Sequence, residues 1–302
     1  MQNMHEDGFD HIFIRVVEAG SLRAVAIELG IDPSSVSRKV TALEDRLQAK
    51  LLRRSTKRSI PTEAGRRYYE GVRRLVDERM ALEADVAGLL DDPRGKLRIG
   101  APVDFGARFV APVIAKLLHD APDLDIELVL GSRFDNLTEA GLDIVVRIGR
   151  LSDSSLIARK VAEVPRVIVA SAEYADMHGL PEHPSELGDH PFVFYRGGQR
   201  RLPLTLSHGK KRQSAEVTGR VAANSVTAIK QLVLGSAGLH QGPLWAFEKE
   251  VSSGRMRVVL PDWAADAFPL YLVRPQTPYL PAKVREFSDR FARAAAAEPS
   301  LE

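Results

Sequence analysis

Apolar positions in the first 50 residues recur three and four apart, and glycines interrupt the pattern twice. The spacing predicts a first helix that ends at Gly20. A second helix is expected from Ser21 to Gly30, and a third begins at Asp32 and ends near residue 48. Ser21 and Asp32 have the short polar side chains that cap helix starts, and a proline follows Asp32 directly. Two short helices joined by a tight turn are typical of a helix-turn-helix.

The stretch after the third helix is short and basic. Ser59-Ile60-Pro61 is compatible with an edge strand, because proline is tolerated at the edge of a sheet. Residues 53–58 would then form a small basic wing. We expect the wing to lie beside the third helix, where it would touch the phosphates or the narrow minor groove of a duplex.

One long helix is predicted from Thr62, its cap, to Asp92. About 30 residues make about 45 Å of helix. Its positions repeat at alternating spacings of four and three, which is a heptad seam with one polar member. So long a seam favours pairing with a second copy of the chain, and packing on its own domain is the alternative. The members of the seam are Tyr68, Val72, Leu75, Arg79, Leu82, Val86 and Leu89.

From residue 96 the pattern changes to strands that alternate with helices. Strands are expected at 97–99, 124–130 and 142–148, with helices at about 106–119 and 134–140. This order indicates βαβ units and a mostly parallel sheet.

A second α/β region follows, reached through crossing strands. A nearly continuous strand over 161–170 is broken by Pro165, and a return strand is expected at 268–274. Two α/β lobes joined in this way form a clamshell with a ligand cleft between them. The other elements expected are a strand at 192–194, a hairpin about Gly209, a helix at 225–236 and a closing helix at 282–297.

The small net charge of the chain conceals a polarised N-terminal part. The total is only +2, but residues 34–74 hold twelve basic and four acidic side chains, a local charge of +8. Residues 75–92 have a local charge of −5. The basic block is a candidate surface for a polyanion, with a merely solvated helical face as the alternative.

Composition narrows the class of protein. Hydrophobic residues at 44% and charged residues at 27% are ordinary for a soluble globular protein, and the absence of cysteine excludes a disulfide framework or a thiol nucleophile. No apolar run approaches the ~20 residues that cross a bilayer. The acidic residues at 6, 7 and 10 do not fit a secretory signal. We therefore expect a cytoplasmic protein with no membrane association.

Residues 21–65 resemble, without a gap, the N-terminal signature of the LysR-type transcriptional regulators. The effector half resembles the CrgA-like branch of that family at Ala101-Pro102-Val103, Arg147-Ile148-Gly149 and Pro261-Asp262-Trp263. The residues of the N-terminal match are Ser21, Ala24, Ala26, Leu29-Gly30, Pro33-Ser34-Ser35-Val36-Ser37-Arg38, Leu43-Glu44, Leu47, Leu51-Leu52, Arg54, Thr56 and Thr62-Glu63-Ala64-Gly65.

The resemblance implies an α/β chain in three parts. Residues 1–65 would form a winged helix-turn-helix DNA-binding domain, and 66–95 a linker helix for dimerisation with a hinge. Residues 96–302 would form an effector-binding domain of the two-lobed periplasmic-binding-protein (type 2) α/β fold. Its lobe one would take 96–164 and 268–302, and its lobe two 165–267.

The implied function is sequence-specific transcriptional regulation in response to a small-molecule effector bound between the lobes. The implied partners are double-stranded promoter DNA, the effector, a second copy through the linker helix, a homotetramer and RNA polymerase. No cofactor and no metal is expected.

In the family the third helix enters the major groove, and small hydroxyls there let the backbone approach the DNA. Arg38 is suited to bond guanine or a phosphate in bidentate fashion. Helix capping is the alternative role for the serines, and an exposed surface charge is the alternative for Arg38. The predicted DNA contacts are Ser34, Ser35, Ser37 and Arg38 on the helix, and Arg54, Lys57 and Arg58 on the wing.

For the effector, helix N-termini and strand ends are the guide, since free N–H groups bind oxygens. Asp104 stands where a neutral hydroxyl is common in the family, so its charge would disfavour an anion unless Arg147 or Arg196 compensates; capping its own helix is the alternative. His240 makes the cleft edge more polar, or else is a core histidine. The predicted effector residues are Pro102, Val103, Asp104, Ser132, Arg147, Arg196, Asn224, Ser225, His240 and Gly242.

Two other classes of function compete with this interpretation. An enzymatic C-terminal domain is disfavoured, because the phosphate-binding, dinucleotide-binding and nucleophile-elbow motifs are absent from the sequence. An architectural DNA-binding protein, whose C-terminal half only oligomerises, is the second. Stabilisation by a ligand would separate it from an effector-binding protein.

Overall fold

The computed structural model describes residues 3–54, 59–86, 93–131, 137, 141–149, 151, 156–195, 201–277 and 280–301. The chain divides into two compact units. The first is built mainly from residues 1–93, with 136–141 and 277–282, and the second from the remainder. Within the described residues no helix is both long and apolar enough to cross a membrane.

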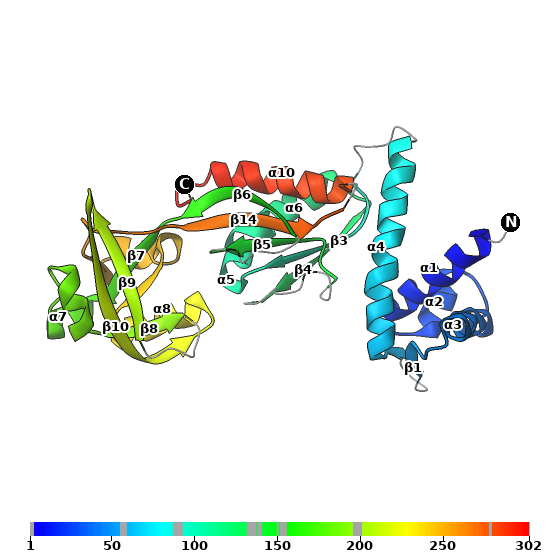
Figure 1. The fold of residues 1–302 in the computed structure, drawn as a ribbon, viewed down its shortest axis with the longest axis horizontal. Helices are drawn as coiled ribbons and strands as arrows, with labels where there is room; N and C mark the ends of the chain where they lie inside the picture. The colour runs from blue at the N-terminus through cyan, green and yellow to red at the C-terminus, as the bar shows by residue number, and fades with distance from the viewer. Residues whose placement is uncertain are drawn as a thin grey trace. The chain divides into compact units, whose positions relative to one another are not determined.

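The first unit contains three short helices, a two-stranded hairpin and a long helix (Figure 1). The predicted caps are present: Ser21 Oγ accepts the Ala24 N–H at 3.4 Å, and Asp32 Oδ1 accepts the Ser34 N–H at 2.7 Å. The helix-turn-helix predicted from these signals is therefore confirmed. The elements are α1 (Asn3–Ala19), α2 (Leu22–Glu28), α3 (Pro33–Leu47), β1 (Leu52–Arg54), β2 (Ser59–Pro61) and α4 (Glu63–Val86).

A buried carboxylate fastens the hairpin to α3. Glu44 is only 3% exposed, and its Oε1 accepts the backbone N–H groups of Leu51 at 2.9 Å and Leu52 at 3.1 Å. Lys50 Nζ donates to its other oxygen at 3.0 Å. The start of α4 approaches the same place, because a Cβ at Gly65 would lie 2.0 Å from Leu51 O. Glycine is therefore required there by space.

Helix α4 begins as predicted, with Thr62 Oγ1 accepting the Gly65 N–H at 3.0 Å. The first seam residue serves its own domain: the Tyr68 ring packs 5.7 Å from Phe13, and its hydroxyl donates to Asp10 at 2.8 Å. Farther along, Leu75 is 65% exposed. The first turns of α4 thus pack on their own domain. Dimerisation through the rest of the helix stays a prediction. Residues 87–92 lie outside the described part of the chain.

The second unit begins with a five-stranded sheet in the order β4-β3-β5-β14-β6. Helix α10 lies along this sheet, where Lys283 Nζ donates to Lys96 O of β3 and Arg159 of β6 pairs with Asp289 (Figure 1). The strands are β3 (Gly95–Ala101), β4 (Leu124–Leu130), β5 (Ile144–Ile148), β6 (Leu156–Val164) and β14 (Phe268–Pro275). The helices are α5 (Val103–Phe105), the π-helix η1 (Gly106–Val110), α6 (Ala111–Asp120) and α10 (Ala282–Ala296).

The other lobe of this unit has two sheets, β13-β9-β10-β8 and β11-β7-β12, joined by a bridge between Phe192 and Leu239. Their apolar faces enclose a core that includes Ile168, Phe194 and Leu206. The strands are β7 (Arg166–Ser171), β8 (Pro191–Tyr195), β9 (Arg201–His208), β10 (Lys211–Ala223), β11 (His240–Pro243), β12 (Met256–Val259) and β13 (Ala264–Ala265). The helices are α7 (Ala172–His178), η2 (Pro184–Asp189), α8 (Val226–Leu234), η3 (Leu244–Ala246) and α9 (Glu248–Ser252).

The three strands predicted at 97–99, 124–130 and 142–148 pair in parallel in the order β4-β3-β5, but the sheets of the chain as a whole are not mostly parallel. Among the described strands, only the pairs β3/β4, β3/β5 and β8/β10 are parallel. Strand β14 returns from the second lobe and enters the first sheet antiparallel to both neighbours, and β9 and β10 form a hairpin at Gly209. The crossing strands broken at Pro165 are confirmed as β6 and β7. Most of the helix expected at 134–140 falls outside the described residues.

Candidate DNA-binding surface and effector site

The first turns of α3 bring the four predicted serine and arginine residues together. Ser34 and Arg38 are exposed, and Ser35 and Ser37 are half-buried. Arg38 Nη2 donates to Ser35 Oγ at 3.2 Å, which orients the guanidinium along the helix surface. The opposite face of α3 is buried through Val36, Val40 and Leu43. One face of α3 is thus fixed in the core while the hydroxyls and the guanidinium face outward.

The predicted wing is a short hairpin whose base is well tied down. Ser59 is buried, its N–H donates to Gly20 O at 2.9 Å, and it pairs with Arg54 across the strands. The neighbouring Arg53 is exposed. The side chain of Arg54 and the whole of Lys57 and Arg58 lie outside the described residues.

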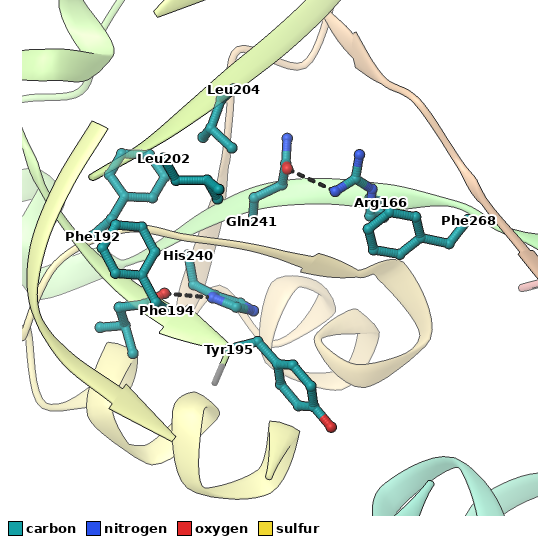
Figure 2. Close-up of a pocket in the computed structure, with 10 residues that line it drawn as sticks. Arg166, Phe192, Phe194, Tyr195, Leu202, Leu204, His240, Gln241 and Phe268 are labelled. Atoms are coloured by element: carbon teal, nitrogen blue, oxygen red, sulfur yellow. Dashed lines mark hydrogen bonds between the residues drawn. The ribbon is translucent and has the colours of Figure 1, made fainter. Parts of the chain in front are cut away.

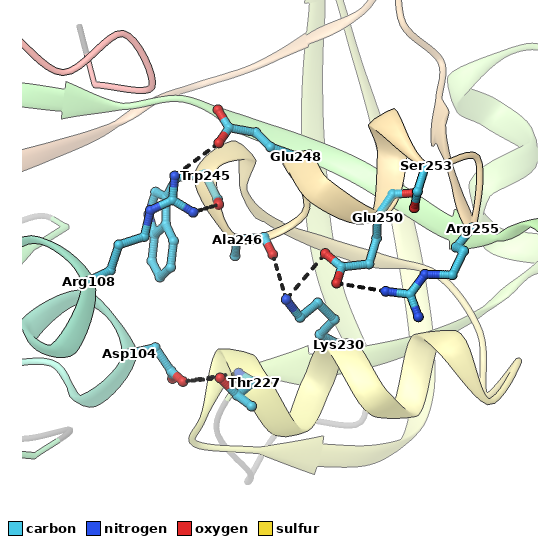
Figure 3. A network of polar contacts seen from close by, with 10 residues as sticks. All are labelled: Asp104, Arg108, Thr227, Lys230, Trp245, Ala246, Glu248, Glu250, Ser253 and Arg255. Carbon is cyan, nitrogen blue, oxygen red and sulfur yellow. Dashed lines mark hydrogen bonds and ion pairs between the residues drawn. The ribbon is translucent and has the colours of Figure 1, made fainter.

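Asp104 contacts the other lobe instead of capping its own helix. Pro102 is the residue at the N-cap of α5, and no side-chain hydrogen bond caps that helix. The Asp104 carboxylate instead accepts hydrogen bonds from Ser225 Oγ, the Val226 N–H, and the N–H and hydroxyl of Thr227 (Figure 3). Ser225 also caps α8, since its Oγ accepts the Ala228 N–H at 3.3 Å. The start of α8 therefore already holds a carboxylate.

The remaining predicted effector residues are less closely grouped. Val103 and Asn224 are exposed, next to Asp104 and Ser225 respectively. Arg147 is half-buried on β5, opposite Tyr271 of β14. Ser132 and Arg196 lie outside the described residues.

A cavity of about 220 Å³ lies beside the crossing strands of the second lobe (Figure 2). Most of its wall is apolar, and its polar side chains are those of Arg166, Tyr195, His240 and Gln241. Arg166 lies over the Phe268 ring, with the guanidinium carbon 3.9 Å from the ring centroid. Its Nη1 donates to Gln241 Oε1 at 2.8 Å. The lining residues are Arg166, Phe192, Val193, Phe194, Tyr195, Leu202, Leu204, His240, Gln241 and Phe268.

Two features of the cavity favour a ligand that accepts hydrogen bonds. The buried Gln241 Nε2 has no hydrogen-bond partner among the described residues. Burial lowers the pKa of Arg166, opposed by the nearby Asp266 carboxylate, but a guanidinium remains charged at neutral pH. Both side chains are therefore donors. Sequence reasoning missed Arg166 and Phe268, although their positions at the crossing strands were predicted.

His240 both lines the cavity and is buried in the core of its lobe. It is 2% exposed, and Nδ1 lies 2.7 Å from Val193 O. Because a carbonyl oxygen can only accept, Nδ1 carries the proton and Nε2 is an acceptor. Burial lowers the pKa of His240 to about 4, outweighing the hydrogen bond to Val193. Gly242 lies against the ring, since a Cβ there would be 2.4 Å from Nε2.

Among the described residues, no cluster of histidine, aspartate and glutamate side chains is suited to hold a metal ion. A winged helix-turn-helix followed by a two-lobed α/β domain with a cavity points to a ligand-responsive DNA-binding regulator, but because one fold can host many functions the assignment rests on the comparison with known families. The comparison with known families agrees. Residues 11–66 match the bacterial regulatory helix-turn-helix protein, lysR family, and residues 90–296 match the LysR substrate binding domain. The chain belongs to the LysR family of transcriptional regulators, with a DNA-binding and an effector-binding domain.

Relatives and solved structures extend over nearly the whole chain. The HTH-type transcriptional activator AaeR of Escherichia coli (strain K12) is 34% identical over 275 residues, covering 91% of this chain and 89% of AaeR. PtxR of Pseudomonas aeruginosa is 29% identical over 303 residues, covering 99% of this chain and 96% of PtxR.

Two full-length regulator structures are similar in fold. The Vibrio cholerae virulence activator AphB has a TM-score of 0.58 and 28% identity, covering 94% of this chain and 97% of AphB. CrgA from Neisseria meningitidis has a TM-score of 0.58 and 26% identity, covering 95% and 97%. The resemblance to CrgA seen in the sequence is thus confirmed.

Proposed function

We propose that this regulator reads promoter DNA with the N-terminal half of α3. The observation that carries the proposal is the grouping of the exposed Ser34 and Arg38 with the half-buried Ser35 and Ser37 on a helix whose opposite face is buried in the core. Arg38 is the base-reading group, because its fork of donors matches the acceptor edge of guanine. The serines contact phosphates, and Arg54, Lys57 and Arg58 of the wing add further phosphate contacts.

We further propose that the working form is a homodimer joined through α4, and that two dimers form a tetramer. The exposed Leu75, with its seam continuing toward residue 89, supports a partner helix. Two copies of α3 would then read the two halves of an interrupted dyad. AaeR and AphB are described as activators, which supports RNA polymerase as a partner of the DNA-bound form.

The test of DNA reading is retention of sheared genomic DNA by the purified protein at ~0.15 M salt, followed by sequencing. We expect sharp peaks that contain a dyad near a few promoters. The genes beside them would indicate the metabolic class of the effector. Uniform retention that disappears as salt is added would indicate attraction to phosphates alone and would contradict the proposal.

For the effector we propose the cavity beside the crossing strands. Asp104 and Ser225 already bond to each other, whereas His240 lines a cavity with two donors, the buried Gln241 Nε2 and the half-buried Arg166 guanidinium. The ligand class that fits is a small, largely apolar molecule with a hydrogen-bond acceptor for Arg166 and Gln241. Its binding at the strands that join the lobes would change the relative stability of two domain arrangements.

The variant Leu202→Trp tests this location. Leu202 lines the cavity and is half-buried, so a larger side chain fills the space with little effect on folding. A ligand found by thermal-shift screening of small molecules stabilises the native protein by about 2.7 kcal/mol at 100 times its Kd. We expect Leu202→Trp to lose most of this shift, and Leu118→Trp, an exposed position on α6, to keep it. An unchanged shift in Leu202→Trp would place the ligand elsewhere.

A further inference from the structure

One helical segment of the first lobe contacts the second lobe through charged and aromatic side chains. Asp104 of α5 meets the start of α8, and Arg108 of η1 meets Trp245 and Glu248, one helical turn farther along (Figure 3). Phe109 packs edge-on against Trp245, with ring centroids 5.4 Å apart. Both contacts join segments more than 100 residues apart in the chain.

The Asp104 carboxylate is bound at the start of α8 in the way that a free anion would be. Its Oδ2 accepts the Val226 N–H at 2.7 Å, and its Oδ1 accepts the Thr227 hydroxyl at 2.6 Å and the Thr227 N–H at 3.2 Å. Ser225 Oγ adds a fourth donor at 3.3 Å. Free N–H groups and the helix dipole make a helix start favourable for negative charge. The carboxylate thus satisfies donors that would otherwise bind water or an external anion.

The Arg108 contact fixes the orientation of the same segment. Nη1 donates to Trp245 O at 2.6 Å, and Nη2 pairs with Glu248 at 3.1 Å. The guanidinium also lies over the Phe109 and Trp245 rings, 5.1 and 5.6 Å from their centroids. Hydrogen bonding, charge and cation–π attraction act together at this point.

On the second lobe, the two contacted segments form one body. Lys230 of α8 donates to Ala246 O at 3.3 Å and to the buried Glu250 at 3.2 Å. Glu250 in turn pairs with Arg255 at 3.1 Å. The start of α8 therefore cannot shift independently of the η3–α9 segment without breaking these bonds, so Asp104 and Arg108 hold one rigid surface.

We propose that Asp104 and Arg108 form a latch that holds the two lobes closed without an effector, with Asp104 occupying the anion position at the start of α8. This deepens the proposed effector response and rests on it. Closure is thus provided by the protein itself, and a ligand changes the response only by binding the latched and unlatched arrangements unequally. An external carboxylate reaches α8 only when the Asp104 carboxylate leaves.

The test is the distance between the lobes in the full-length protein. The chain has no cysteine, so Lys116→Cys on α6 and Met177→Cys on α7, both exposed, provide two unique spin-label sites. We expect one narrow distance distribution within the chain when this labelled parent is assembled with an excess of unlabelled chains, and sodium acetate should leave it unchanged. Asp104→Ala should move the distribution to longer distances and broaden it, and acetate, but not chloride at the same ionic strength, should restore the parent distribution.

Control variants separate the latch from general destabilisation. Asp176→Ala removes an exposed carboxylate of the second lobe that pairs with Arg257 at 2.8 Å, and it should leave the distribution unchanged. Asp104→Asn keeps the side-chain shape without the charge and should open the lobes less than Asp104→Ala. Unchanged distances in Asp104→Ala would overturn the latch, and opening that acetate does not reverse would overturn the anion position. The distances in Asp104→Ala and their response to acetate are both measured without DNA. A negative result in either therefore leaves the proposal of DNA reading intact.

Discussion

Replacing Arg38 with alanine is expected to weaken binding to a promoter dyad by about 100-fold or more. A bidentate arginine–guanine pair contributes about 1–3 kcal/mol of discrimination, and a dimer would lose two such pairs. Folding should not change, because Arg38 is exposed and its side chain bonds Ser35 on the same helix. The measurement is fluorescence anisotropy at ~0.15 M salt with a recovered promoter fragment, together with a thermal melt.

Two further variants show whether the effect is specific to this position. Arg212→Ala removes an exposed arginine of the effector domain that pairs with Asp266, and it should bind the promoter like the parent. Arg38→Lys keeps the charge but loses the fork of donors, so it should retain non-specific binding and lose preference for the dyad. Unchanged promoter affinity in Arg38→Ala would remove this residue from the reading surface.

The features predicted correctly from the sequence depend on residues close together in the chain. Ser21, Asp32 and Thr62 cap helices through N–H groups two or three positions away, and the turn at Gly209 joins adjacent strands. Such signals act within one turn of the backbone, so the pattern of residues contains them in full. The helix-turn-helix and the hairpin follow from them.

The features that were missed depend on residues far apart in the chain. Strand direction in the first sheet is decided by where β14 returns, after the whole second lobe. The partners of Asp104 lie more than 120 positions away, and Arg166 bonds Gln241 across 75. Local patterns place each of these residues at a helix start or strand end but do not indicate its partner. This is why the sequence predicted that the charge of Asp104 would disfavour an anion, but did not predict that Asp104 contacts α8.

Glu44→Ala is expected to destabilise the DNA-binding unit by about 4 kcal/mol. The substitution leaves the buried N–H groups of Leu51 and Leu52 without a partner, and each such loss costs about 1–3 kcal/mol. It also removes the contact that fastens β1 to α3, so the wing should lose its fixed position. Urea unfolding monitored by circular dichroism measures the change. Asp45→Ala, an exposed carboxylate on the same helix, is the matched control and should change stability little.

The same contact predicts a pH dependence with a definite sign. Burial alone would raise the pKa of Glu44, but hydrogen bonds from Leu52, Lys50 and Leu51 outweigh it, and the pKa is lowered. A carboxyl with a lower pKa in the folded state stabilises fully above its unfolded pKa of about 4.3. That contribution is lost as the pH falls through the folded pKa. The stability of Asp45→Ala should therefore fall more steeply below about pH 4.3 than that of Glu44→Ala. Parallel pH profiles would show that Glu44 does not hold the hairpin as a carboxylate.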